Sequence, residues 1–371
     1  SSLEKTTQIA IELLKKQKIT DYEVSLGKSS GVSTKVRLSE VETLQYHLDT
    51  SFDVNVYIGK KKGHASSGDL GKESLIRAIE SACLIAKYTQ EDPFNGLAPK
   101  ERLAWQVPEL DLYHFWDLDA KKSIDIATEC EEAALQQPEI DNSDGAEISS
   151  FEGESIYANS NGLVARAKNT KHSLYCSLIA KREREMQTAY EYSVALDAGE
   201  LFPAKQVGME AARLAQQKLG SQNLRPQKCP ILFTPRQSTG LFSQLLGALS
   251  GSRQYKKTSF LLESQGHKVL PETISVFENP LQVKTIGARS FDQDGVKKRK
   301  QFFVEDGKVS SYIMGQYSAN QLGLESTANA GGVSNCCISP NYSGGFKELI
   351  KDMDRGLIVT DLMGHGVNMT T

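Results

Sequence analysis

The first half of the chain is dominated by runs in which apolar and polar residues alternate. Tyr22, Val24 and Leu26 alternate with polar residues, and the same period of two returns on both sides of the Asn161-Gly162 pair. Alternation with this period predicts strands that bury one face, and Asn-Gly between two such runs is a strong hairpin signal. The pattern therefore predicts an antiparallel meander, because hairpins join antiparallel neighbours.

Four segments of the same half show the helical period instead. They span residues 2–17, 72–88, 119–137 and 203–219, and they alternate with groups of predicted strands. Apolar residues at a spacing of three and four are typical of amphipathic helices that cover a sheet. The sequence therefore predicts an α+β protein with an N-terminal α/β domain whose sheet is mixed or antiparallel.

A polar segment with two prolines, residues 221–230, is the predicted boundary between two domains. It separates an N-terminal domain, residues 1–220, from a β-rich C-terminal domain, residues 231–371. In the second domain we expect strands over 269–277, 296–304 and 310–316, a turn at Asp306-Gly307 and a short helix over 347–353.

The segment 238–259 is expected to form the helix around which the C-terminal domain is built. Its apolar residues lie at helical spacing: Leu241, Phe242, Leu245, Leu246 and Leu249. This spacing predicts a short, largely buried helix. The helix should break at Gly251 and be followed by a basic polar loop over 252–257.

Charge and composition argue against several classes of function. Lysine and arginine number 43 against 46 acidic residues, a net charge of −3 that gives no overall attraction to nucleic acid. No apolar stretch approaches the roughly 20 residues of a membrane span, and no signal pattern begins the chain, so we expect a cytoplasmic protein. The six cysteines and six histidines are scattered. They predict no metal or other cofactor in this chain.

Three groups of residues are candidates for binding a substrate. Arg253, Tyr255 and Lys256 in the basic segment could hold a carboxylate or phosphate, although such a segment is more often a solvated loop. Gly331 and Gly332 belong to a glycine-rich run that either offers N–H groups to an extended peptide or forms a loop with positive φ. A third candidate is His365, between two glycines, where a turn is the alternative.

Several motifs, in the same order along the chain, resemble the TldD/PmbA family, and in particular its PmbA/TldE branch. They include Val54-Asn-Val-Tyr-Ile-Gly59, Asp92-Pro-Phe94, Gly247-Ala-Leu-Ser-Gly251, Ala330-Gly-Gly332 and Gly356-Leu-Ile-Val-Thr-Asp-Leu-Met-Gly364. The resemblance covers essentially the whole chain. It implies a modulator of gyrase or a peptide-maturation metalloprotease, with family members that continue beyond position 371, so we expect the C-terminal domain to be incomplete here.

The resemblance also implies a zinc site that this chain has lost. In the family, TldD-type subunits carry H-E-x-x-x-H on the helix that corresponds to the one predicted here, together with a cysteine later in the chain. Ser243, Gln244 and Ala248 occupy the three motif positions. These side chains offer neither imidazole ligands nor a general base. We therefore expect no catalytic residue here, and three cleft-facing positions that form an emptied metal site.

The resulting prediction is a non-catalytic subunit of a zinc peptidase. A TldD-type catalytic subunit would hold the zinc, and this chain would supply chamber walls and substrate-binding surface for extended or unfolded peptides. On its own it could form a homodimer, and neither nucleic acid nor membrane is an expected partner. Two alternatives stay open at this point, a stand-alone peptidase with a different site and a non-enzymatic peptide-binding or regulatory protein.

Overall fold

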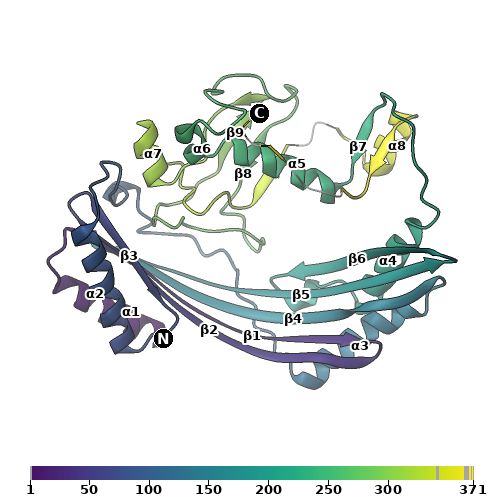
Figure 1. Cartoon of the computed structure of the whole chain (residues 1–371), viewed down its shortest axis with the longest axis horizontal. Helices are drawn as coiled ribbons and strands as arrows, with labels where there is room; N and C mark the ends of the chain where they lie inside the picture. Colours follow the sequence, from purple (N-terminus) through teal and green to yellow (C-terminus); the bar gives the residue numbers. More distant parts are fainter. Residues whose placement is uncertain (1, 340–341, 363–366, 369, 371) are drawn as a thin grey trace.

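A long, curled sheet of six antiparallel strands is the main feature of the computed structural model, which describes residues 2–339, 342–362, 367–368 and 370 (Figure 1). The strand order is β3-β2-β1-β4-β5-β6. Both the predicted α+β class and the antiparallel meander are confirmed. The strands are β1 (Asp21–Arg37), β2 (Glu40–Ile58), β3 (Lys61–Ser67), β4 (Ile140–Asn159), β5 (Val164–Arg182) and β6 (Glu185–Ala195).

Four helices cover the outer face of this sheet in two pairs. One pair packs at each end of the long strands, and the C-terminal part of the chain lies over the inner side of the curl (Figure 1). The helices are α1 (Ser2–Lys15) with α2 (Lys72–Tyr88), and α3 (Ala120–Leu135) with α4 (Ala204–Gln217). All four were predicted from the helical period.

The period of two explains how single strands serve two cores. In β1, Val24 and Leu26 pack in the core beneath α1 and α2, whereas Val32 and Val36 pack in the core beneath α3 and α4. Even-numbered residues of β1 share one face because side chains alternate along a strand. The other face carries the odd-numbered residues and looks toward the C-terminal part.

The C-terminal part is built from short elements and long connections. A four-stranded sheet has the order β10-β9-β8-β11, and β12 pairs in parallel with β7. Its strands are β7 (Ile231–Phe233), β8 (Val276–Glu278), β9 (Gln301–Glu305), β10 (Lys308–Val309), β11 (Cys336–Ile338) and β12 (Leu357–Val359). Its helices are α5 (Pro235–Ala248), α6 (Gly251–Lys256), α7 (Gln316–Leu322) and α8 (Phe346–Met353).

Several predicted boundaries in this part were wrong. The strands expected over 269–277 and 296–304 shrink to β8 and β9, and the strand expected over 310–316 is absent. There, Ile313 makes only an isolated bridge with Ser250, and helix α7 begins at Gln316. The apolar residues of 310–316 pack in a core with residues of α5 and α7, so their alternation did not reflect a paired strand.

The predicted turn at Asp306-Gly307 is confirmed, because it joins β9 to β10 and Gly307 has a φ of 75°. Segment 221–230 contains no helix or strand, which fits a connection between two parts, but the division into two domains stays a prediction. Among the residues that the structure describes, no helix has the length and apolar character that a membrane crossing requires.

Candidate functional site

Helix α5 is less buried than its apolar spacing predicted. It begins at Pro235, where proline at the first helical turn needs no N–H partner, and only Ala248 among its residues is buried. Leu241 is 46% exposed, so it is not the core residue that we expected. The expectation of a largely buried helix was wrong because one side of α5 has few neighbours.

The three motif positions on α5 lie in different surroundings. Ser243 is exposed, and its hydroxyl donates a hydrogen bond to the Thr239 carbonyl at 2.8 Å; Gln244 is half-buried. Ala248, in contrast, is fully buried. Residues five apart differ by about 140° around an ideal helix, so Ser243 and Ala248 point to different sides. The expectation that all three positions face one cleft was therefore wrong for Ala248.

The end of α5 is held from the next segment of the chain. The Ala248 carbonyl accepts hydrogen bonds from Gln254 Nε2 at 2.9 Å and from the Ser259 hydroxyl at 2.6 Å. Both donors are buried polar side chains. The break that Gly251 predicted is confirmed, because α5 ends at Ala248 and α6 begins at Gly251.

The side chains present on α5 do not fit a zinc ion. Zinc in proteins is held by imidazole, thiolate or carboxylate groups, and a hydroxyl, an amide and a methyl group provide none of these. Within the described ranges, no cluster of three or more histidine, cysteine, aspartate or glutamate side chains is arranged to hold a metal. The side chains that the structure describes therefore form no set of ligands for a catalytic metal ion.

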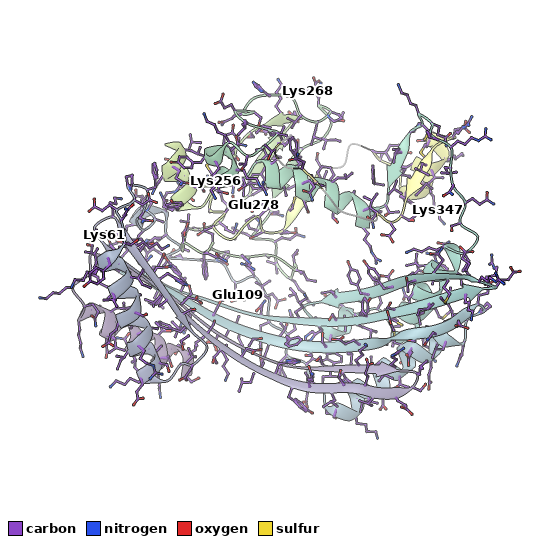
Figure 2. The ribbon with its side chains drawn as sticks, in the orientation of Figure 1. Lys61, Glu109, Lys256, Lys268, Glu278 and Lys347 are labelled. Atoms are coloured by element: carbon purple, nitrogen blue, oxygen red, sulfur yellow. The ribbon has the colours of Figure 1, made fainter. Side chains whose placement is uncertain are left out.

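The basic segment after Gly251 is a helix rather than the predicted loop. Arg253 and Lys256 lie in α6, which ends where Lys257 adopts a left-handed φ of 54°. Tyr255 is 42% exposed, and its ring meets Phe94 edge to face at 5.7 Å. Lys256 is exposed on the surface of the C-terminal part (Figure 2). Helix α6 therefore carries two cationic side chains, Arg253 and Lys256, and the aromatic ring of Tyr255.

The glycine-rich run has the loop conformation rather than a free row of donors. Gly331 and Gly332 have φ values of 84° and 103°, which favour glycine. The neighbouring amides of Ala330 and Ser334 already donate to Asp292 Oδ2 and Glu278 Oε2, each at 3.0 Å. Among the residues that the structure describes, no hydrogen bond or ion pair joins these glycines to Arg253, Tyr255 or Lys256. His365 lies outside the described residues.

A buried ionic network anchors this glycine-rich loop, and the sequence reasoning missed it. Glu278 in β8 is fully buried (Figure 2). Its carboxylate accepts hydrogen bonds from Lys298 Nζ at 3.4 Å and from Gln301 Nε2 at 2.6 Å. Asn329 Nδ2 reaches both carboxylate oxygens at 3.1 Å. Burial lowers the pKa of Lys298, and the nearby Glu278 carboxylate opposes that effect. The network fixes the loop; it has no open position for a ligand.

A second missed feature is a cluster of tyrosine rings on the inner face of the sheet. Tyr175, Tyr190 and Tyr192 are each about two-fifths exposed, with ring centroids 5.6 Å apart for the first two and 6.4 Å for the last two. Arg236, in the first turn of α5, lies over Tyr190 and Tyr192 at 5.5 and 4.8 Å and pairs with Glu191. The sequence signal that could have revealed this cluster is the spacing of two between Tyr190 and Tyr192, which places both rings on one face of a predicted strand.

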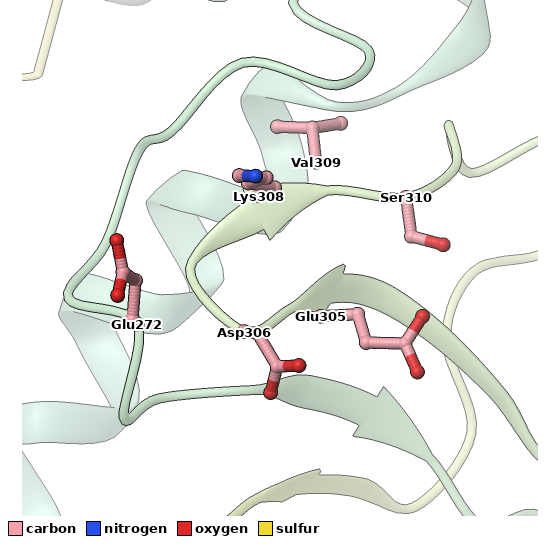
Figure 3. Close-up of a pocket in the computed structure, with 6 residues that line it drawn as sticks. All are labelled: Glu272, Glu305, Asp306, Lys308, Val309 and Ser310. Carbon is pink, nitrogen blue, oxygen red and sulfur yellow. The ribbon is translucent and has the colours of Figure 1, made fainter.

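A surface cavity lies away from all of these groups. It has a volume of about 670 Å³ and surrounds the β9–β10 turn (Figure 3). Its lining is acidic and polar, and it includes none of the predicted site residues. The lining residues are Glu272, Glu305, Asp306, Lys308, Val309 and Ser310.

Comparison with known proteins gives the family of the chain. Residues 22–86, 113–219 and 226–371 match domain 1, the central domain and the C-terminal domain of PmbA/TldA metallopeptidases. The chain is 37% identical to the metalloprotease PmbA homolog of Haemophilus influenzae and 35% identical to the metalloprotease PmbA of Escherichia coli O157:H7. Each match covers 100% of this chain and 82% of the relative. The chain belongs to the PmbA/TldD family.

Solved structures share the fold. A candidate modulator of DNA gyrase from Bacteroides thetaiotaomicron superposes with a TM-score of 0.93 at 26% identity, over 99% of this chain and 84% of that one. TldE from Thermococcus kodakarensis superposes with a TM-score of 0.77 at 21% identity, over 98% of this chain and 83% of that one. The recognition made from the sequence is thus confirmed, and this is a PmbA/TldE-type chain of a peptidase family.

Proposed function

We propose that this chain is the metal-free subunit of a heteromeric zinc peptidase that cuts extended or unfolded peptides. A TldD-type partner holds the zinc and the general base, and this chain contributes part of the chamber and of the surface that binds the substrate. The observation that carries the proposal is the donor set on α5, where Ser243, Gln244 and the buried Ala248 offer zinc no ligand. The alternatives, a peptidase that acts alone and a purely binding protein, predict different outcomes below.

The tyrosine cluster, Tyr175, Tyr190 and Tyr192 with Arg236, is the part of the proposed substrate surface with the strongest support. Exposed aromatic rings offer large apolar area with a polar tip, which suits the mixed side chains of an unfolded peptide. Arg236 and Ser243 lie on one helix, separated by about 10 Å along its axis. A peptide on the rings would therefore pass within a few residues of the motif positions.

Mixing the chain with a TldD-type partner tests the proposal. We expect a hetero-oligomer in size-exclusion chromatography and cleavage of an unfolded peptide at least tenfold faster than with the partner alone. A mixture that forms no complex and cleaves no faster than the partner would contradict the proposal. If this chain alone cleaves the peptide and loses that activity to a chelator, the stand-alone peptidase is correct instead.

Substitution of the cluster should weaken substrate binding more than turnover. In the active complex, Tyr190→Ala combined with Tyr192→Ala should raise KM about tenfold, because two desolvated ring contacts contribute roughly 1.4 kcal/mol in total. Tyr46→Ala is the control, because Tyr46 is 70% exposed on the strand β2 and lies outside the cluster. Equal KM values for the double variant and the control would remove the cluster from the substrate surface.

A further inference from the structure

The loop around Asp294 forms one of the contacts between the sheet and the C-terminal part. Gly295 leaves no room for a side chain there, since an added Cβ would come within 2.5 Å of the Tyr157 ring. Val296 forms an isolated β-bridge with Leu103, and both belong to an apolar cluster that includes Tyr157 of β4 and Ala165 of β5. We call this contact of residues 291–297 with the sheet the seam.

Charged and polar groups face Asp294 from the sheet, from its own loop and from α7. From the sheet these are Glu23 on β1, Tyr57 on β2, Lys62 on β3 and Tyr157 on β4; from its own loop it is Asp292, and from α7 the backbone amide of Gln316. Lys62, the cation that faces the group, already lies 4.0 Å from Glu23. The local balance of charge is therefore negative.

Apart from the backbone amide of Gln316, the hydrogen-bond donors named around the seam donate to acceptors other than Asp294. Tyr57 and Tyr157 each donate to Glu23 at 2.9 Å. Asp292 receives the amides of Asp294, Val296 and Ala330. The backbone N–H of Gln316 donates to Asp294 Oδ2 at 2.7 Å. The side-chain Oε1 of Gln316 is buried and accepts no hydrogen bond from the residues that the structure describes. A surplus of acceptors favours a carboxyl group that carries its proton.

We propose that Asp294 is a proton-dependent latch, which holds the C-terminal part against the sheet when its carboxyl is protonated and weakens the seam when it ionises. The ionised form would place a further negative charge opposite Glu23 and the buried Asp292 at a half-buried position. This inference is independent of the proposed function, since it concerns the contact between two parts of one chain.

The sign of the effect follows from the two protonation equilibria. Burial and the neighbouring Asp292 raise the pKa of Asp294 to about 7 in the closed seam, whereas an open, solvated aspartate has a pKa near 3.9. The seam is therefore most stable below about pH 4, and its stability falls as pH rises toward 7. Above that value both states are ionised, and the dependence levels off.

Hydrogen exchange of the whole chain tests the latch. After correction for the intrinsic pH dependence of exchange, protection of residues 291–298 should fall about tenfold per pH unit between roughly pH 5 and 6.5 and level off above about 7.5. Helix α4 is the internal control and should not follow this slope. In Asp294→Asn, which keeps an uncharged side chain of similar size, the slope at the seam should become markedly shallower, and any slope that is left would come from Asp292, whose pKa burial also raises.

A second variant keeps the test decisive if Asp294→Asn does not fold. Glu23→Gln removes a negative charge that faces Asp294. Protection of the seam should therefore stop falling at a lower pH than in the unaltered chain. The latch is wrong if protection of the unaltered seam shows no slope beyond the intrinsic one. It is equally wrong if the slope persists unchanged in Asp294→Asn. It is also wrong if, in Glu23→Gln, protection stops falling at the same pH as in the unaltered chain.

Discussion

Replacement of Glu278 with alanine is expected to lower the free energy of unfolding by about 3–5 kcal/mol, the usual cost of removing one partner of a buried ion pair. Lys298, which is 1% exposed, would lose its paired carboxylate and keep only the attraction of Asp292. Asn329 and the Ser334 amide would lose the acceptor that holds the glycine-rich loop. The large effect comes from the groups left behind more than from the lost pair itself.

Chemical denaturation at pH 7 measures this effect, with Glu305→Ala as the matched control. Glu305 is an exposed glutamate in the neighbouring strand β9, and its removal should change stability by less than about 0.5 kcal/mol. The removal of both charges, with Glu278→Leu and Lys298→Met, should cost less than Glu278→Ala. Equal stability of Glu278→Ala and Glu305→Ala would show that the network does not support the fold.

Substitution of Gly208 with alanine is the second change with a large expected effect. Gly208 lies in α4 where it crosses α3, and an added Cβ would come within 2.0 Å of the Cys130 carbonyl oxygen. Backbone atoms cannot turn aside, so the helices must separate. Overpacking of this kind costs about 1–3 kcal/mol, even after the roughly 1 kcal/mol that alanine gains over glycine in a helix.

Gly240→Ala provides a control of opposite sign. Gly240 also lies within a helix, α5, but an added Cβ would meet nothing within 4 Å. This substitution should therefore raise the free energy of unfolding by about 0.5–1 kcal/mol. If Gly208→Ala is as stable as the unaltered chain or more stable, the contact between α3 and α4 does not depend on the missing side chain.

The elements that follow a simple period could be predicted from the sequence. The four N-terminal helices and the β4–β5 hairpin came directly from spacing and from Asn161-Gly162, because each has one face in a core. The strand expected over 310–316 failed for the opposite reason. Its residues Tyr312 and Met314 are buried by loops and by α7, so an alternating pattern arose without a paired strand.

The site was less accessible to sequence reasoning because its components are distant in the chain. The replacement of the motif at Ser243, Gln244 and Ala248 could be recognised from the resemblance, but the burial of Ala248 depends on Ser259 and α6 folding beneath it. The pairing of Glu278 with Lys298 left no local pattern either. The assignment of Arg253, Tyr255 and Lys256 as substrate-binding residues stays a prediction.

Zinc content tests the central claim most directly. The chain would be purified alone and as a complex with a TldD-type partner, and metal would be measured after dialysis against a weak chelator. We predict no retained zinc in the chain alone and zinc in proportion to the partner in the complex. Tightly held, stoichiometric zinc in this chain alone, together with peptide cleavage that a strong chelator abolishes, would contradict the account.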